Sequence, residues 1–127
     1  MKQPQIQRFL PRQLGPKSWG LEIVVAHTKD YTGKVLLMKA GRSGPLQYHR
    51  VKDETFHLFR GRARVYFGTP EKITSRTMVS GESYYVPPGA IHRVEAITNC
   101  VFFEASTPVF DDRVAVVVDD QLGEDHA

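Results

Sequence analysis

Short strand-like runs, separated at regular intervals by glycine and proline, constrain the fold of this chain more than any other feature. Turn sequences such as Gly68-Thr69-Pro70 and Pro87-Pro88-Gly89 divide apolar, β-branched and aromatic stretches, and no segment has the periodicity of an amphipathic helix. Many short strands at spacings of about 8–12 residues predict an all-β, antiparallel sandwich or barrel. We expect strands at residues 21–27, 34–39, 46–49, 54–59, 62–67, 72–78, 83–86, 91–96, 100–105 and 114–118.

The length of 127 residues suits a single domain with one hydrophobic core. Residues 1–18 are rich in proline, glutamine and arginine, and we expect them to form an irregular N-terminal arm. The β-barrel domain is expected over residues 19–118, and the acidic residues 119–127 are expected to form a flexible tail. Cys100 is the single cysteine, and its apolar surroundings predict a buried, inert thiol.

The charge and hydropathy of the chain exclude several classes of partner. The net charge is +3 and the sequence pI is near 9.1, but the basic residues are dispersed, so we expect no nucleic-acid binding. No apolar stretch approaches the roughly 20 residues that span a bilayer, and the first residues lack the apolar core of a secretory signal. We therefore expect no membrane association and a cytoplasmic location. A mildly basic surface suits a small anionic substrate such as a sugar phosphate.

A small set of polar residues has the composition of a metal site. Gln47 and His49 are two residues apart and share one face of a strand. Glu54 lies on the other side of a polar turn that can reset the facing of the chain, and His92 follows the rigid turn at residues 87–89. Two imidazoles, a carboxylate and an amide oxygen form a plausible first shell for a divalent metal. By alternation, His57 points away from Glu54 and is excluded as a ligand.

The spacing of these residues resembles the two signature motifs of the cupin superfamily. The first motif, Gly-x5-His-x-His-x4-Glu-x6-Gly, is matched with Gln47 in place of the first histidine, and the second, Gly-x5-Pro-x-Gly-x2-His-x3-Asn, is matched with Ala96 in place of the asparagine. This resemblance implies an antiparallel double-sheet jelly-roll barrel. It also implies a divalent metal, which the ligand types do not narrow beyond Zn, Mn, Fe, Co or Ni. The implied ligands are Gln47, His49, Glu54 and His92.

A narrower resemblance is to the cupin domain of type II mannose-6-phosphate isomerases. It is carried by Leu46-Gln47-Tyr48-His49 with Glu54, by Trp19-Gly20 and by Gly33-Lys34-Val35. It implies an aldose–ketose isomerase that acts on a sugar phosphate through a metal-stabilised enediol. Residues 109–113 resemble the ending of that family, but the closing Tyr-Gly-Arg is absent, which leaves the phosphate subsite open.

We name Glu54, Lys34 and Arg93 as candidate catalytic residues. Glu54 is also a candidate ligand, which weakens it as a base, so Lys34 or a metal-bound hydroxide is an alternative. Lys34 binds a phosphate or sugar hydroxyl in this interpretation, or is simply solvated. Arg93 follows His92 and faces the other side of its strand unless the turn distorts it.

Other polar residues near the motifs have two interpretations each. Arg42, Arg50 and Lys52 lie in predicted loops and could form a rim for an anionic ligand, or be solvated. Glu104, in an apolar strand, is a partner for a buried base or a second active-site carboxylate.

Two other functions stay open on the sequence alone. Two histidines and a carboxylate also match the ligands of non-haem iron dioxygenases. A non-catalytic module that binds metal or carbohydrate is the third possibility. We expect a homodimer, formed through the sheet face that carries Thr55, His57 and Phe59.

Overall fold

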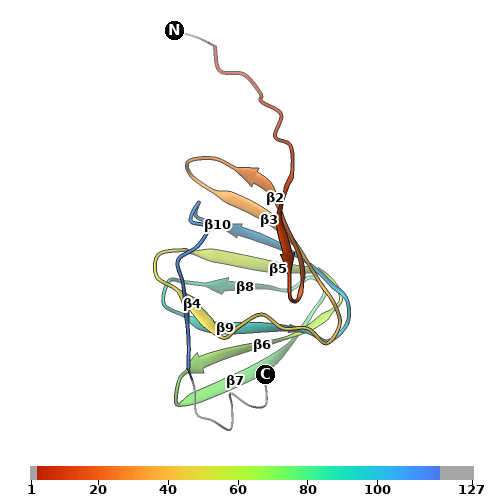
Figure 1. The fold of residues 1–127 in the computed structure, drawn as a ribbon, viewed down its shortest axis with the longest axis vertical. Helices are drawn as coiled ribbons and strands as arrows, with labels where there is room; N and C mark the ends of the chain where they lie inside the picture. The colour runs from red at the N-terminus through yellow and green to blue at the C-terminus, as the bar shows by residue number, and fades with distance from the viewer. Residues whose placement is uncertain (1–2, 118–127) are drawn as a thin grey trace.

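The computed structural model describes residues 3–117 and consists of two antiparallel β-sheets packed face to face (Figure 1). The strands are β1 Arg12–Lys17, β2 Gly20–His27, β3 Thr32–Met38, β4 Gln47–His49, β5 Glu54–Arg60, β6 Arg62–Thr69, β7 Lys72–Val79, β8 Ser83–Val86, β9 Ile91–Ala96, β10 Cys100–Ser106 and β11 Arg113–Ala115. One sheet has the order β1-β2-β3-β10-β5-β8, and the other has the order β11-β4-β9-β6-β7. The all-β double-sheet jelly roll is therefore confirmed.

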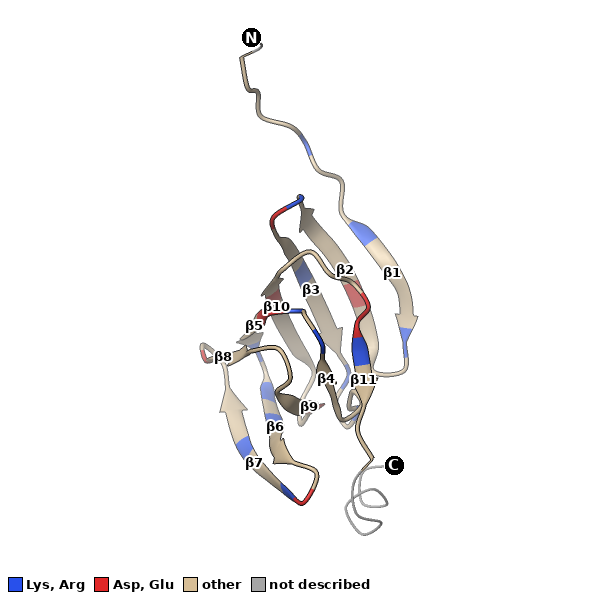
Figure 2. Cartoon of the chain, turned by 90° about the vertical axis from the view of Figure 1, so that its left-hand side faces the viewer, with Lys and Arg blue, Asp and Glu red and all other residues tan. Residues whose placement is uncertain are grey.

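Each predicted strand matches an observed strand, but β1 was not predicted. It lies inside the segment expected to be irregular and pairs with β2, with a register shift between Gln13 and Pro16. A proline is tolerated there because β1 is an edge strand, where an amide can be lost without breaking a ladder. Residues 3–11 form no strand and project away from the sheets (Figures 1 and 2). The predicted tail, residues 119–127, lies outside the described residues.

The interior of the barrel changes from apolar to charged along neighbouring strands. Phe102 on β10 lies in register between Leu36 on β3 and Leu58 on β5. Two residues further along the same strand, Glu104 lies opposite Lys34. The barrel therefore has an apolar half and a charged half, and the charged half lies where β5 begins. The apolar half is a single cluster that includes Met38, Phe56, Leu58, Ala63, Val65, Met78, Val86, Ala96, Cys100 and Phe102.

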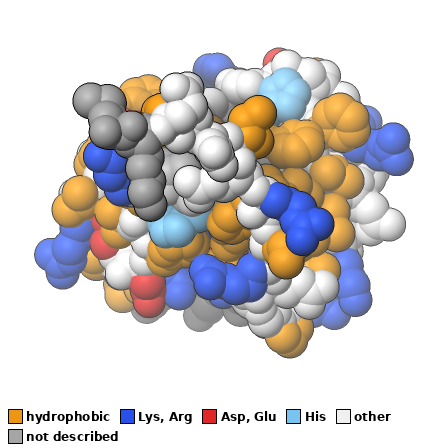
Figure 3. All heavy atoms as spheres, turned by 90° about the horizontal axis from the view of Figure 1, so that it is seen from above, with side chains coloured by type: hydrophobic (Ala, Val, Ile, Leu, Met, Phe, Trp, Pro, Cys, Tyr) orange, Lys and Arg blue, Asp and Glu red, His pale blue; other side chains and the backbone are white. Residues whose placement is uncertain are grey.

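The outer surface carries both apolar and basic side chains. Phe59 and Phe103 are 55% and 43% exposed and meet edge to face, with ring centroids 5.7 Å apart. Hydrophobic side chains also lie between lysine and arginine side chains on the face shown in Figure 3. The homodimer stays a prediction. Within residues 3–117 no helix has the length and apolar character needed to cross a membrane.

The tight turn between β5 and β6 depends on Gly61, which ends the first motif. Its φ is +113°, and a Cβ at this position would lie 2.6 Å from the Asn99 carbonyl oxygen and 2.9 Å from the Cys100 sulfur.

The Cys100 thiol is buried and donates to the Arg62 carbonyl at 3.1 Å, and burial raises the pKa of this thiol. The prediction of a buried cysteine is confirmed.

Gly61→Ala should lower the free energy of unfolding by roughly 3 kcal/mol, because it adds a clash with backbone to an unfavourable φ. Gly44→Ala is the matched control, since a Cβ there meets no atom within 4 Å; we expect a change below about 0.5 kcal/mol. Urea denaturation measures both values. Equal stability of the two variants would contradict the role assigned to Gly61.

Candidate metal centre

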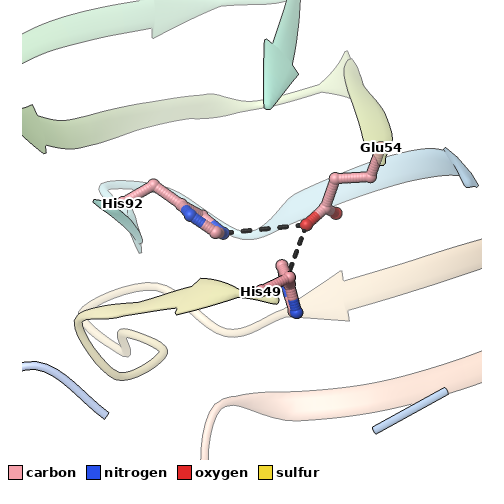
Figure 4. Close-up of side chains that lie close together, drawn as sticks. All are labelled: His49, Glu54 and His92. Atoms are coloured by element: carbon pink, nitrogen blue, oxygen red, sulfur yellow. Dashed lines mark ion pairs between the residues drawn. The ribbon is translucent and has the colours of Figure 1, made fainter. Parts of the chain in front are cut away.

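Three predicted ligands converge at the boundary between the two halves of the barrel. His49 lies on β4, Glu54 on β5 and His92 on β9, and all are buried. Their ligand atoms lie within 4.8 Å of one another. The Glu54 Oε1 atom is 2.9 Å from His49 Nε2 and 3.7 Å from His92 Nε2 (Figure 4). Residues from three separate strands therefore meet at one point.

Strand register explains how these side chains meet. Gln47 lies directly opposite His92 in the β4–β9 pair, so their side chains share one face of the sheet. His49, two residues further, shares that face. Asp112 holds the turn to β5, because its Oδ2 accepts hydrogen bonds from the amides of Val51 at 2.7 Å and Lys52 at 2.8 Å. The turn breaks the alternation of side chains between β4 and β5. Glu54 therefore points inward, toward the histidines, from the opposite sheet.

Both histidines are oriented through their Nδ1 atoms. Nδ1 of His92 lies 3.0 Å from the Ala90 carbonyl oxygen, which can only accept, so this nitrogen carries the proton. Nδ1 of His49 lies 3.1 Å from Asp112 Oδ1. Burial alone would raise the pKa of Asp112, but hydrogen bonds from Lys52, Val51 and His49 lower it, so it stays a carboxylate and accepts. Both Nε2 atoms are therefore left to bind a cation.

The donor set fits a divalent metal. Glu54 Oε1 is buried and has no well-aligned hydrogen bond, although two Nε2 atoms lie close to it. Burial lowers the pKa of His92 more than neighbouring groups raise it, which favours the neutral ring that ligates metals. Three lone-pair-bearing atoms that face one another inside a protein repel unless a cation lies between them. His49, Glu54 and His92 are therefore the residues that would hold the metal.

Comparison with known proteins agrees with this geometry. Residues 34–106 match the family model of a cupin domain. The chain belongs to the cupin family. A search of curated proteins finds no match.

Several solved structures share the cupin fold of this chain. The capsular polysaccharide assembling protein CapF from Staphylococcus aureus has a TM-score of 0.75 at 22% identity, over 87% of this chain and 33% of CapF. KdgF from Halomonas sp. has a TM-score of 0.70 at 19% identity, over 80% of this chain and 91% of KdgF. Oxalate decarboxylase from Bacillus subtilis has a TM-score of 0.70 at 16% identity, over 83% of this chain and 30% of the decarboxylase. The chain thus spans about a third of CapF. These identities establish the fold alone.

The other residues that the sequence analysis discussed lie in different surroundings within this cupin barrel. Gln47 is half-buried and lines the same interior cavity as the three ligands, so it faces the site, while its ligation of a metal stays a prediction. The exclusion of His57 is confirmed, since its Nδ1 lies 2.8 Å from Ser83 Oγ and it is not part of the group. Lys34 is buried rather than solvated, and its Nζ lies 2.9 Å from Glu22 Oε2.

The structure does not bring the Arg93 guanidinium to the three ligands. The guanidinium carbon lies 4.2 Å from the centre of the Tyr66 ring, and Tyr66 donates a hydrogen bond to Glu95 at 2.9 Å. Arg93 and Tyr66 are register partners, and alternation along β9 places Arg93 on the face opposite His92. The catalytic role of Arg93 stays a prediction that this geometry does not support.

Lys52 fits neither alternative that its place in a predicted loop offered, a basic rim or a solvated side chain. Lys52 is 4% exposed, and its Nζ lies 2.8 Å from Glu104 Oε2 and 4.0 Å from Glu54 Oε2. The turn that Asp112 holds directs this side chain inward, where burial would lower its pKa but the two carboxylates raise it. The prediction that Glu104 is the partner of a buried base is confirmed.

The two carboxyl groups beside Lys52 have opposite pKa shifts. Burial raises the pKa of Glu104 to about 7, and the charge on Glu54 adds to this effect. Burial would also raise the pKa of Glu54, but the His49 ring, 2.9 Å away, and the charge on Lys52 lower it to about 2. One ammonium cannot neutralise two buried carboxylates, so below about pH 7 the proton stays on Glu104.

Replacement of the metal ligands should abolish metal binding. His49→Ala should lose the stoichiometric divalent metal, and Asp112→Asn should bind it about 10- to 100-fold more weakly, because it no longer orients the His49 ring. Elemental analysis and titration with Mn²⁺ or Zn²⁺ measure both effects. His57→Ala is the control and should keep full occupancy. Normal metal content in His49→Ala would overturn the site.

Glu104→Gln should change how the stability of the metal-free protein depends on pH. Between pH 4.5 and about 7 the folded wild type keeps the Glu104 proton, while the unfolded chain loses it. The free energy of unfolding of the wild type, measured relative to Glu104→Gln, should therefore fall as pH rises through this window, by about 3 kcal/mol at most. Urea denaturation at several pH values tests this. A constant difference would contradict the raised pKa of Glu104.

Proposed function

We propose that this cupin is a metal-dependent isomerase that moves a proton between neighbouring carbons of a small sugar phosphate. The observation that carries the proposal is a buried carboxyl–ammonium pair, Glu104 and Lys52, beside the three metal ligands in one cavity. Aldose–ketose isomerisation needs a group that takes a proton and returns it, as well as a way to stabilise charge on the substrate oxygens. When bound, a divalent metal supplies a Lewis acid that polarises those oxygens.

The residues of the cavity have separate roles in this proposal. Glu104 holds or moves the proton, because it lies in the interior but is not one of the ligands. Lys52, at 2.8 Å, holds the Glu104 carboxyl in place and favours its charged form during the transfer. Lys34, held by Glu22, lies beside Glu104 on the neighbouring strand, where a substrate hydroxyl would bind. Trp19 forms part of the same wall and excludes water.

The size of the cavity favours a substrate that is only partly enclosed. The interior cavity measures about 130 Å³, well below the roughly 300–1,000 Å³ of sites that bury whole ligands. A second hollow of about 310 Å³ shares the wall residues Pro45, Gln47 and Arg113 with it. The reacting carbons would lie inside, and the phosphate would lie in the outer hollow against Arg113, where it would replace the Asp111 carboxylate that pairs with Arg113 at 3.4 Å. The narrower resemblance to mannose-6-phosphate isomerases supports this substrate class.

One observation favours a second candidate, an oxygen-using iron enzyme. The ligands that the structure brings together are two histidines and one carboxylate, the set used by non-haem iron oxygenases. The cavity around this set is lined by charged residues, which suits a substrate rich in oxygen atoms better than an apolar one. A sugar phosphate is rich in oxygen atoms, so we place isomerisation before the oxygen-using reaction.

The test combines metal-loaded protein, a panel of aldose and ketose phosphates, and NMR in D₂O. We expect interconversion, with deuterium incorporated at the carbon that exchanges its proton. Glu104→Gln should keep its metal and lose about 10²-fold or more in turnover, because a general acid–base contributes on that order. His57→Ala is the control and should keep full activity.

Two outcomes would reject the isomerase. Oxygen uptake with candidate enediols or catechols after anaerobic loading with Fe²⁺ would support the second candidate. Saturable sugar-phosphate binding without turnover under any metal would support a non-catalytic binding module.

A further inference from the structure

We propose a second binding site, for an organic phosphate, at the end of the six-stranded sheet far from the metal ligands. A cavity of about 640 Å³ lies there, between the β1–β2 turn, the end of β3 and the start of β10. Arg60 lines it at one end of β5, whereas Glu54 begins that strand, so the two sites lie about 20 Å apart along β5. The proposal does not depend on the proposed isomerase activity.

The charge of this cavity is the first argument. Lys17, Lys39, Arg42 and Arg60 line it, and its lining contains no aspartate or glutamate. They come from separate parts of the chain, so the fold rather than a basic run in the sequence brings them together. Within residues 3–117 none of these four side chains has an ion pair or a hydrogen bond to its charged group.

The interior of the same protein shows a different arrangement. The buried lysines Lys34 and Lys52 each lie within 3 Å of a carboxylate, at 2.9 Å from Glu22 and 2.8 Å from Glu104. At the far end, four positive charges share one cavity without a protein anion. Like charges that share a concave surface repel one another, and an anion that enters relieves this repulsion. The cavity therefore has an excess of positive charge that an anionic ligand would neutralise.

The shape and floor of the cavity define the ligand further. Its volume lies within the roughly 300–1,000 Å³ of small-molecule sites. Leu21, Leu37 and Val101 are half-buried and line it beside the buried Met38. Asn99 accepts a hydrogen bond from the Ala40 amide through Oδ1 at 2.9 Å, which leaves its NH₂ group as a further donor.

Arginine forks match phosphate oxygens, and an apolar floor matches an apolar or planar body. The ligand class that satisfies both features is a phosphate ester with such a body. Arg42, for which the sequence offered a place at the rim of the metal site or a solvated position, lines this cavity.

The experiment is a titration at low ionic strength, by calorimetry, with ADP, pyrophosphate and adenosine as probes. We expect saturable binding of ADP, weaker binding of pyrophosphate and none of adenosine. Raising the salt concentration should weaken the binding of ADP, because Lys39, Arg42 and Arg60 are exposed. The double variant Arg42→Glu/Arg60→Glu should bind ADP at least about 100-fold more weakly, since each hydrogen bond to a charged group contributes about 10-fold or more.

The matched control is Lys29→Glu/Lys72→Glu, which changes the net charge equally at two exposed positions outside the cavity. It should bind ADP nearly as the wild type does. Both double variants should melt near the wild-type temperature and keep their metal content, which separates this site from the metal centre. An equal loss of ADP affinity in both double variants, or no saturable binding of ADP to the wild type, would overturn the proposal. Pyrophosphate that binds as tightly as ADP would overturn the role of the apolar floor.

Discussion

A carboxylate oxygen buried between two imidazole nitrogens is the constraint on which the rest of this structure depends. Glu54 Oε1 has no well-aligned hydrogen bond, and an uncompensated buried charge costs several kcal/mol. A cation at this point offsets that cost. The surrounding elements hold the three side chains in place: Asp112 fixes the β4–β5 turn and one histidine, and the Ala90 carbonyl fixes the other. The charged half of the barrel is thus organised around one point.

The parts of this arrangement that depend on local sequence could be predicted. Strand positions followed from turn residues and alternation, because many of the strands are separated by glycine or proline, as at Gly61, Gly81 and residues 87–89. Gln47 and His49 share a face for the same reason, and the exclusion of His57 follows from parity alone. The convergence of these strands could not be derived from alternation, and there the fixed spacing of the two motifs supplied the prediction.

The parts that depend on long-range contacts were missed. Asp112 lies 63 residues from His49, and nothing near it in the sequence marks it as a partner of that ring. Lys52 lies in a polar turn, where exposure is the ordinary expectation, and only the two distant carboxylates explain its burial. The strand β1 was missed because glycine and proline, which usually end strands, are tolerated at the edge of a sheet.

The unequal anchoring of the two histidines has an evolutionary consequence. The His92 ring is held by a main-chain carbonyl, which no substitution at position 90 removes, whereas the His49 ring is held by the side chain of Asp112. A substitution at position 112 can therefore change the orientation of the His49 ring without replacing any ligand. The orientation of the His92 ring does not depend on a side chain in this way. Divergence of relatives toward new metals or chemistries has an accessible route through position 112.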